Sequence, residues 1–517
     1  PLYQGETSDN TKSGYLRLAV RSPASDRSLL QEDHDYVRFL LAHKYKDSEM
    51  LQIRMLHPSQ ICFDFFKISL EICYNDHEEC RSKSTAPTGL RLIDVRTKKV
   101  CCAIPGYQYI ALSYVWGNTH SQNPKEDFPP VVQDAMSVTK ALGCQYLWVD
   151  RYCIDQSSSH RISMIQQMDR VYGNAFVTII AASANSSQDG LPGMSGPPRR
   201  QERLKLGDIN LVELSSVGQE TVKMGRWATR GWTFQEGYLS KRRLIFTEKE
   251  VLLLCNHELV KETQTGSEAD PYRVMDLSHR RARSEESHAT RIRNSFYWMM
   301  PTARGRLNWK ARLQEEIEEY SSRELSHESD SLNALLGILR YHESISFHWS
   351  SQRISHLWGI PLSLHVGQHV SFNLLWQRGT SRTRRKSFPS WSWLGWAGSF
   401  RFTDLGDQLK VLPQTAEENI YGKADDFVNP ASNHKLQIHI PHDGGTIDLH
   451  QFMRDRDLET SRHADSRELI IQSLVISLRL REVHTHPGSN GKAWEDPSHW
   501  EAQKPVVVAT FPLEPGV

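Results

Sequence analysis

The sequence predicts an α/β fold with a parallel β-sheet at its centre. Between residues 90 and 260, three apolar runs alternate with two segments whose apolar residues recur at helical spacing. Continuous apolar runs are typical of strands that are buried on both faces of a sheet. The order strand–helix–strand–helix–strand then predicts parallel strands joined by right-handed crossovers. We expect a helical N-terminal segment before this core and a mixed α+β region, rich in tryptophan, after it.

Length, charge and cysteine usage restrict the class of protein. A chain of 517 residues is too long for one hydrophobic core and suggests roughly two to four domains. Its formal net charge is +1, which gives no sign of a surface for nucleic acid or membrane. No apolar run approaches the roughly 18 residues of a membrane helix, and the N-terminus, which begins with Pro1, lacks a secretory signal pattern. Eight cysteines do not form a dense disulfide framework here, so we expect a reducing, cytoplasmic location.

Residues 1–89 are expected to form a helical lead-in. Within them, ICFDFFKISLEIC (61–73) has its apolar residues at helical spacing, and the pattern ends in YNDHEEC (74–80). The lead-in is therefore expected to contain at least one amphipathic helix.

Cysteine and histidine residues at the end of this helix form a metal-site candidate. Cys73, His77 and Cys80 stand at spacings that a metal ion could use. A structural zinc site needs four ligands, and only these three are evident, although Cys101 and Cys102 could contribute. A packed helix end explains the same pattern, so the sequence predicts no metal site.

Two helical patterns separate the predicted strands of the core. The first, PPVVQDAMSVTKALG (129–143), has prolines at its start and a glycine at its end. Its apolar face is made by Val131, Ala135, Val138 and Leu142. The second, SSSHRISMIQQMDRVYG (157–173), has serines available as N-caps. Its apolar face is made by Ile162, Ile165, Met168 and Tyr172.

The composition changes twice after the core. Residues 261–329 are polar and indicate a connector followed by charged surface helices. Residues 330–517 form the predicted C-terminal region, which begins with an apolar helix at DSLNALLGILRYH (330–342). Its cluster FPSWSWLGW (388–396) is expected in a core or a domain seam, although tryptophan is also favoured at the centre of interfaces.

The ends of the predicted strands select the candidate site residues. The strands are YIALSYVW (109–116), YLWVD (146–150) and FVTIIAAS (176–183). Ligands of parallel sheets bind beyond the carboxyl ends of the strands. The residues at these ends are Ser113, Tyr114, Trp116 and Gly117 for the first strand, Asp150, Asp155 and Gln156 for the second, and Ser183 and Asn185 for the third. Hydroxyls, carboxylates, amides and aromatic rings suit a sugar with an aromatic base better than a bare phosphate, and no Gly-rich phosphate loop is present.

Five motifs follow one another along the core: YIALSYVWG, YLWVDRYCIDQ, QMDRVYGNAFVTIIAAS, GLPG and RGWTFQEGYLSKRRLIF. With RLIDV (91–95) before them and FPSWSWLGW (388–396) after them, they resemble the fungal heterokaryon incompatibility (HET) domain. The resemblance covers residues 90–260, about a third of the chain. It implies a role in nonself recognition and regulated cell death in filamentous fungi.

The resemblance also implies a distant relationship to Toll/interleukin-1 receptor (TIR) domains, and with it a TIR-like, flavodoxin-like sheet. Some TIR domains cleave NAD+ at the nicotinamide–ribose bond, and their catalytic helix carries a glutamate four residues after a tryptophan. Trp232 and Glu236 have this spacing. The resemblance therefore implies Glu236 as the catalytic carboxylate, with NAD+ as a substrate and no cofactor.

A single carboxylate is sufficient for this chemistry. Most glycosidases need a second carboxyl group to protonate the leaving group, whereas nicotinamide leaves as a neutral ring. One carboxylate could hold the ribose hydroxyls and stabilise the developing positive charge. Trp232, Tyr114 or Trp116 could stack on the nicotinamide, and Arg230 could pair either with the pyrophosphate or with a surface acid.

Structural explanations compete with each of these roles. Thr233 and Glu236 fit a capping box, in which the threonine caps the helix and the glutamate bonds back to the backbone. Glu236 could instead pair with Arg230 or Arg242. The aspartates at the strand ends commonly form turns, and the aromatic residues there could belong to the core.

The sequence thus predicts a cell-death protein that hydrolyses NAD+, with a homo-oligomer formed on activation and a protein partner in incompatibility signalling. The alternative is a non-enzymatic module that oligomerises or recruits partners. A third class is an enzyme that acts on another small molecule, because a fold alone does not fix chemistry. The position of Glu236, in an open pocket or as a helix cap, discriminates between the first two.

Overall fold

The computed structural model describes residues 18–20, 37–41, 52–81, 85–104, 106–117, 128–155, 160–201, 203–206, 209–214, 219–265, 299, 309–349, 352–365, 370–372, 376–378, 383–402, 410–411, 437–442, 445–448, 470–473 and 506–509. These residues form two compact units. The first unit takes its described residues from 1–307, with additions at 323–326 and 333–338. The second takes them from 308–322, 327–332 and 339–517.

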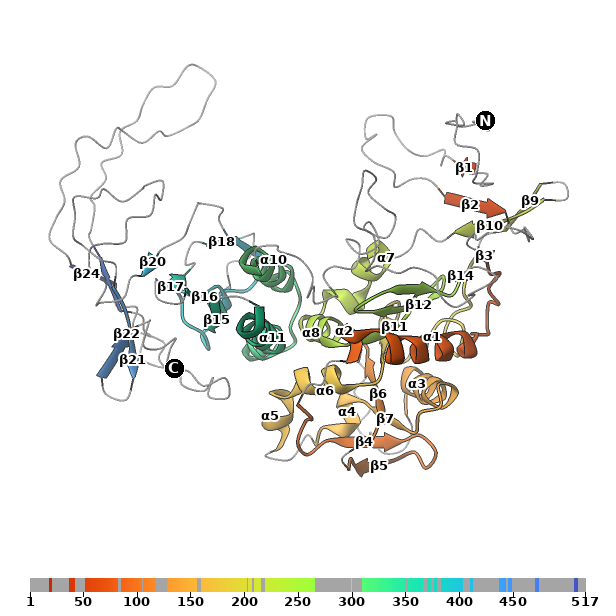
Figure 1. Cartoon of the computed structure of the whole chain (residues 1–517), viewed down its shortest axis with the longest axis horizontal. Helices are drawn as coiled ribbons and strands as arrows, with labels where there is room; N and C mark the ends of the chain where they lie inside the picture. Colours follow the sequence, from red (N-terminus) through yellow and green to blue (C-terminus); the bar gives the residue numbers. More distant parts are fainter. Residues whose placement is uncertain are drawn as a thin grey trace, which may run out of the picture. The chain divides into compact units, whose positions relative to one another are not determined.

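An eight-stranded sheet forms the centre of the first unit (Figure 1). Its strand order is β13-β12-β11-β8-β6-β7-β4-β5. The neighbours β11, β8, β6 and β7 run parallel, whereas the strands at both edges are antiparallel. The strands are β4 (Arg91–Asp94), β5 (Lys99–Cys102), β6 (Tyr109–Ser113), β7 (Tyr146–Trp148), β8 (Thr178–Ala181), β11 (Arg242–Phe246), β12 (Val251–Cys255) and β13 (Leu259–Lys261).

The parallel strands confirm the predicted α/β fold. β6, β7 and β8 are the three predicted apolar runs, and every residue of β6 and β8 is buried. Counted along the chain, β6, β7, β8 and β11 are the first to fourth parallel strands, so their order across the sheet is 2-1-3-4. Flavodoxin-like sheets have this order, and their topology reverses between the first and third strands. The expected binding crevice therefore lies at the carboxyl ends of β6 and β8.

The helix between β6 and β7 agrees closely with its prediction. α3 (Pro130–Ala141) begins with a proline, whose missing N–H is not needed in the first turn. All four residues of the predicted apolar face, from Val131 to Leu142, are buried. Gly143 follows with a φ of +79°, a left-handed conformation that glycine adopts without steric strain.

The single helix predicted for residues 157–173 is wrong. The structure has two helices instead, α5 (His160–Ile165) and α6 (Met168–Asn174). Gln167 lies at the break, and its side-chain oxygen accepts a hydrogen bond from the backbone N–H of Thr88 at 2.8 Å. This side chain therefore serves a neighbouring loop at the point where the helix is interrupted.

The break also changes which apolar residues face the core. Ile162 is 68% exposed, and Met164 is buried in its place. Met168 and Tyr172 on α6 are buried as predicted. One helical period cannot describe two helices with separate axes, so the predicted face holds only for the second of them.

The N-terminal part of the first unit contributes helices and strands. α1 (Phe63–Asp76) confirms the predicted amphipathic helix, and α2 (Glu78–Arg81) follows it directly. Phe65, Phe66 and Leu70 of α1 belong to the hydrophobic core of the eight-stranded sheet. α1 is thus an integral layer of the α/β core.

Strands also occur in the segment for which only helix was expected. They are β1 (Leu18–Val20), β2 (Val37–Leu41) and β3 (Gln52–Ile53). β1 and β2 form a sheet of order β1-β2-β10-β9 with β9 (Arg203–Leu206) and β10 (Ile209–Leu214). β3 pairs with β14 (Gln264–Thr265).

The second unit combines helices with antiparallel strands. Its helices are α10 (Trp309–Ser321) and the part of α11 (Asn333–Trp349) from Leu339 onward. One sheet has the order β15-β16-β17-β20, a second consists of β18-β19, and a third has the order β22-β21-β23-β24. The strands are β15 (Gln352–Leu357), β16 (Ile360–His365), β17 (Val370–Phe372), β18 (Trp376–Arg378), β19 (Phe400–Phe402), β20 (Lys410–Val411), β21 (Gln437–His442), β22 (Gly445–Asp448), β23 (Ile470–Ser473) and β24 (Val506–Ala509).

Two expectations for this unit have clear outcomes. Trp393, from the predicted tryptophan cluster, is buried and stacks on Phe400 with ring centroids 4.7 Å apart, so the cluster contributes to a core. The description of α10 as a surface helix is wrong for Glu316, which is buried against Arg312 and His342. Most of the predicted polar connector lies outside the described residues.

None of the helices that the structure describes has both the length and the hydropathy of a membrane-spanning segment.

Candidate functional site

Glu236 lies on α8 (Gly231–Leu239), the helix that leads into β11. Ser240, directly after the helix, donates to the backbone oxygen of Glu236 and shares a 2.6 Å hydrogen bond with Thr178 at the start of β8. Arg243 of β11 donates to the backbone oxygens of Gly237 and Tyr238 in the last turn. These bonds satisfy free carbonyls at the helix end and fix α8 against the amino end of the sheet.

The capping-box explanation of Glu236 is wrong. α8 begins at Gly231 with Arg230 as its N-cap, so Thr233 lies inside the helix. The hydroxyl of Thr233 contacts the backbone oxygens of Trp227 and Arg230 at 2.5 and 2.8 Å. The carboxylate of Glu236 accepts a hydrogen bond from another element altogether.

That hydrogen bond joins α8 to the carboxyl end of β6. Ser113, the last residue of β6, donates its Oγ to Oε2 of Glu236 at 2.5 Å. Side chains on a helix lean toward its N-terminus, which here directs Glu236 toward the carboxyl ends of the parallel strands. The structure therefore brings Glu236 to the carboxyl end of β6, the end of the sheet where the strand order predicts ligand binding.

A second donor fixes the direction of this bond. Trp227, on η1 (Arg226–Thr229), donates Nε1–H to the Oγ of Ser113 at 2.7 Å. Indole nitrogen can only donate, so Ser113 accepts from Trp227 and gives its own proton to Glu236. Gly237 makes room for this arrangement, because a Cβ there would lie 2.9 Å from the ring of Trp227.

Trp227 and Tyr172 were not among the predicted site residues. Tyr172 of α6 is buried, its hydroxyl donates to the backbone oxygen of Leu112 at 3.3 Å, and its proximity lowers the pKa of Glu236. It also packs edge-on against Trp148, with ring centroids 5.4 Å apart. The sequence placed Tyr172 only on a buried helix face, and Trp227 precedes the recognised motif by three residues. Proximity of these rings to one carboxylate is visible only in three dimensions.

Burial alters the acidity of two carboxyl groups at this site. Burial, with a smaller contribution from the nearby charge of Asp150, raises the pKa of Glu236 from 4.5 to about 7 against the opposing effects of the Ser113 hydrogen bond and the charge of Arg230. Burial also raises the pKa of Asp150 from 3.8 to about 6. Two interacting acids thus have their pKa values moved close to neutrality, a property that is common at functional sites.

Asp150 is held at the start of α4 (Asp150–Cys153), directly after β7. It accepts hydrogen bonds from the indole N–H of Trp116 at 2.9 Å and from the backbone N–H of Arg151 at 2.6 Å. The guanidinium of Arg151 lies over the ring of Trp116, 5.9 Å from its centroid. Trp116 is partly exposed, so this pair reaches the surface beside the Glu236 cluster.

Two hydroxyl groups at the strand ends have no hydrogen-bond partner within the described part of the chain. They are the phenol of Tyr114, after β6, and the Oγ of Ser183, after β8. Burial raises the pKa of Tyr114 well above 10, so its phenol is a neutral donor. An unsatisfied buried hydroxyl costs about 1–3 kcal/mol, which a bound polar molecule would offset.

The remaining predicted residues have more varied surroundings. Gly117 has a φ of +77°, and a Cβ there would lie 2.7 Å from the Cβ of Ser186, so it permits close contact of the loops after β6 and β8. Asp155 is exposed and forms a 3.5 Å ion pair with Arg91 of β4. Gln156 lies outside the described residues.

Two of the predicted residues flank Glu236 on its own helix. Arg230 is the N-cap residue of α8, and its positive charge lowers the pKa of both Glu236 and Asp150. Trp232 is partly buried and packs on the hydrophobic core. The pairing of Glu236 with Arg242 is wrong, because the guanidinium of Arg242 donates to Cys73 and to two backbone oxygens.

The arrangement can stabilise a positive charge that develops near Glu236. One ionisable carboxyl lies among aromatic rings and hydrogen-bond donors, where electrostatic interactions are stronger than in water. A pKa of about 7 leaves roughly half of these groups ionised at neutral pH.

Comparison with known protein families identifies part of the chain. Residues 109–236 match the family model described as heterokaryon incompatibility protein (HET), and this segment ends at Glu236. The recognition of a HET domain is confirmed over this stretch, about a quarter of the chain, and it supports a role in heterokaryon incompatibility. Neither the curated proteins nor the solved structures gave a match.

Proposed function

We propose that this chain, which carries a HET domain at residues 109–236, hydrolyses NAD+ at the nicotinamide–ribose bond and that Glu236 is its catalytic carboxylate. The observation that carries the proposal is the position of Glu236. It is a buried carboxyl with a pKa of about 7, at the carboxyl end of β6, hydrogen-bonded to Ser113 and surrounded by aromatic side chains. A structural helix cap would have neither this position nor this environment.

The reaction needs one negative charge and little proton transfer. The bond from C1′ of the ribose to the pyridinium nitrogen breaks, and its electron pair neutralises the leaving nicotinamide. Water then adds to the sugar cation and loses a proton to solvent. The ionised form of Glu236 stabilises the cation, and the donors Ser113 and Trp227 keep the carboxylate oriented.

Polar and aromatic groups at the carboxyl ends of the strands suit the rest of this substrate. The unpartnered hydroxyls of Tyr114 and Ser183 would meet ribose oxygens. The partly exposed ring of Trp116 offers a stacking surface for an aromatic base, and Arg230 is the nearby cation for a pyrophosphate. The ionised form of Asp150 adds a second negative charge that would also stabilise the sugar cation.

Access to Glu236 is restricted in this structure. The residue is only 5% exposed, so NAD+ reaches the carboxylate only after a covering group moves. We therefore expect a latent enzyme, whose activity appears when the chain is activated by assembly. The dilute protein should therefore hydrolyse NAD+ more slowly, per chain, than the concentrated protein.

The test is nicotinamide release from NAD+ by the purified full-length chain at low and high protein concentration. Glu236→Gln keeps the shape of the side chain and removes its charge, and we expect it to lower the rate at least about 100-fold. Glu248→Gln is the matched control, because Glu248 is an exposed carboxylate of the same unit. It should leave the rate unchanged.

The pH profile gives a second readout. Because the ionised carboxylate is the active form, the rate should rise with pH through about 7, where Glu236 loses its proton. Equal release by the wild type and Glu236→Gln would move catalysis to another residue. No release at any concentration would favour a non-enzymatic signalling module, with Glu236 as a buried structural group.

A further inference from the structure

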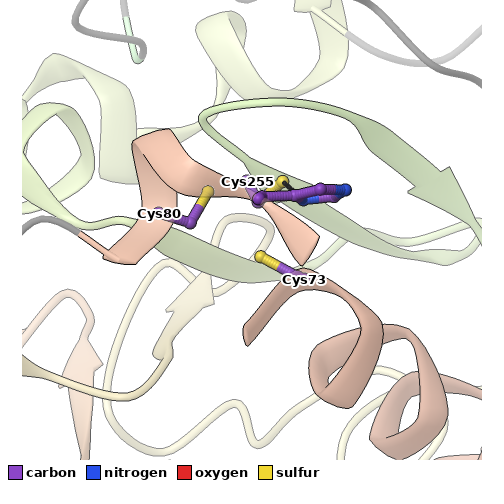
Figure 2. Close-up of side chains that lie close together, drawn as sticks. Cys73, Cys80 and Cys255 are labelled. Atoms are coloured by element: carbon purple, nitrogen blue, oxygen red, sulfur yellow. Dashed lines mark hydrogen bonds between the residues drawn. The ribbon is translucent and has the colours of Figure 1, made fainter. Parts of the chain in front are cut away.

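Four potential metal ligands converge at the amino end of the eight-stranded sheet, away from Glu236. Cys73 lies near the end of α1, His77 directly follows that helix, Cys80 lies on α2, and Cys255 is the last residue of β12. In the antiparallel pair β11–β12, Cys255 lies opposite Arg242, the first residue of β11, so Cys255 is at the amino end of the parallel strands. Figure 2 shows the side chains of the three cysteines close together, although they come from different elements.

The distances suit a tetrahedral zinc ion. One ligand atom from each of the four residues lies within 4.8 Å of all the others. In a tetrahedral thiolate site with Zn–S bonds of about 2.3 Å, neighbouring sulfur atoms are about 3.8 Å apart. A small contraction around an ion therefore produces the required geometry. Three thiolates and one imidazole are a common ligand set for structural zinc.

The histidine has the orientation of a zinc ligand. Nδ1 of His77 lies 3.4 Å from the sulfur of Cys255, and Nε2, on the other side of the ring, lies 3.7 Å from a carboxylate oxygen of Glu258. A carboxylate on the outer nitrogen fixes the tautomer of a ligating histidine and makes it a better ligand. The ring also stacks on His257, with centroids 4.1 Å apart.

Neighbouring hydrogen-bond donors would stabilise negative charge on the sulfur atoms. The backbone N–H groups of His257 and Glu258 point at the sulfur of Cys255 at 3.3 and 3.2 Å. The guanidinium of Arg242 donates to the sulfur of Cys73 at 3.1 Å. Three thiolates with Zn²⁺ carry a net charge of −1, and the single positive charge of Arg242 balances it.

From this geometry we propose that Cys73, His77, Cys80 and Cys255 bind one structural zinc ion. All four side chains are buried, so no coordination position is open to a substrate. The ion would clamp α1 and α2, from the N-terminal segment, to β12 of the sheet. This site is independent of the proposed NAD+ hydrolysis.

The proposal replaces the expectation from sequence that no metal is bound. That expectation rested on three ligands, with Cys101 and Cys102 as distant candidates for a fourth. The structure places those two cysteines on β5, at the edge of the sheet remote from β12. Cys255 supplies the missing ligand from a position that is far away in sequence and adjacent in space.

The first experiment is metal analysis of the full-length chain, purified without chelator. We expect one zinc per chain by mass spectrometry of the metal content. Replacement by Co²⁺ should give the intense visible bands of a tetrahedral thiolate site. A thiol reagent should leave Cys73, Cys80 and Cys255 unmodified until a chelator is added.

Variants separate the site from the other cysteines. Cys255→Ser should abolish stoichiometric zinc, whereas Cys101→Ser and Cys144→Ser should retain it, because neither residue belongs to the cluster. His77→Cys preserves four ligands and should keep zinc with a shifted cobalt spectrum. Glu258→Gln, which removes the charge beside His77, should weaken zinc binding about 10-fold.

Several outcomes would overturn the assignment. Wild-type chain that contains no zinc and does not bind added Zn²⁺ under reducing conditions would exclude the site. A disulfide within the cluster, or iron with inorganic sulfide, would replace zinc by another chemistry. If Cys255→Ser proves insoluble, the wild-type metal content and the His77→Cys spectrum still decide the question.

Discussion

Buried ionisable groups have opposite surroundings at the two ends of the central sheet. At the carboxyl end, Glu236 is buried, its pKa is raised to about 7, and the hydroxyl of Tyr114, the residue after β6, lacks a partner in the described structure. At the amino end, Cys73, His77 and Cys255 are surrounded by backbone N–H groups, a guanidinium and a carboxylate. Both ends belong to the same unit and share β11 and its neighbours.

The difference indicates a division of roles. Buried polar groups that have all their hydrogen-bond or ion-pair partners stabilise a fold. A buried acid that lacks some of these partners lowers the stability of the protein, so its presence indicates a functional role. The two proposals accordingly place a stabilising metal site at the amino end and the chemistry at the carboxyl end. Changes at the two ends should shift the stability of the protein in opposite directions.

Removal of the proposed zinc ion should have the largest effect on stability. Binding energy of a structural zinc ion contributes directly to folding, so a strong chelator should lower the melting temperature by roughly 10 °C or more. Thermal unfolding of the full chain with and without chelator measures this. Readdition of Zn²⁺ should restore the original value, and the chelator should leave the melting temperature of Cys255→Ser unchanged.

Glu236→Gln should stabilise the protein, in contrast to changes at the amino end. The folded-state pKa of Glu236 is about 7 and the unperturbed value is 4.5. Below pH 4.5 the carboxyl is protonated in both states, so it has no effect. Between pH 4.5 and 7 the unfolded chain loses this proton first, and stability falls. Above pH 7 the loss is complete, on the order of 3 kcal/mol.

The gain from Glu236→Gln should accordingly be absent at pH 4.5 and reach its maximum above pH 7. Denaturant unfolding at these pH values is the appropriate measurement, with Glu248→Gln as the control for an exposed carboxylate. A loss of stability in Glu236→Gln above pH 7 would contradict the comparison, since it would make the charged form of Glu236 a stabilising group.

Tyr114→Phe should separate stability from substrate binding. It removes a buried hydroxyl without a partner and retains the ring, so we expect the free energy of unfolding to rise by about 1 kcal/mol. If the hydroxyl meets a ribose oxygen, KM for NAD+ should also rise while kcat stays nearly constant. Reduced stability would show that the phenol has a partner in solution.

Asp155→Asn should have the smallest effect. The side chain is exposed, and its ion pair with Arg91 spans 3.5 Å at the surface, where such pairs contribute about 0–1 kcal/mol. We expect unchanged NAD+ hydrolysis and a change in unfolding free energy below about 0.5 kcal/mol. A large drop in activity would contradict this expectation and indicate that Asp155 binds the substrate.

Local patterns in the sequence are sufficient for much of the fold. The apolar runs at β6, β7 and β8 and the amphipathic helices α1 and α3 are all present as predicted. Each depends on residues within a few positions of one another, and periodicity records such relations directly. The prediction failed at residues 157–173, where Gln167 bonds to a distant loop and the helix divides.

The candidate site was predictable only in part. Glu236, Ser113 and Asp150 were identified from a motif and from strand ends, and the structure brings Ser113 and Glu236 into contact. Trp227 and Tyr172 were missed because nothing local distinguishes a tryptophan or tyrosine that meets a carboxylate from one that fills a core. The capping box was a plausible local pattern, and the true start of α8 at Gly231 removes it.

The sequence alone determined the class of fold, the order of its central strands and helices, and the HET motifs, because these are encoded in short, contiguous patterns. Tertiary structure decided two things. It directed the carboxylate of Glu236 to Ser113 on another element, where burial rather than capping sets its pKa. It also brought Cys255 to Cys73, His77 and Cys80, which precede it by 175 to 182 residues in the chain. Such convergence depends on how strands are ordered across a sheet, and that order appears in no local stretch of sequence.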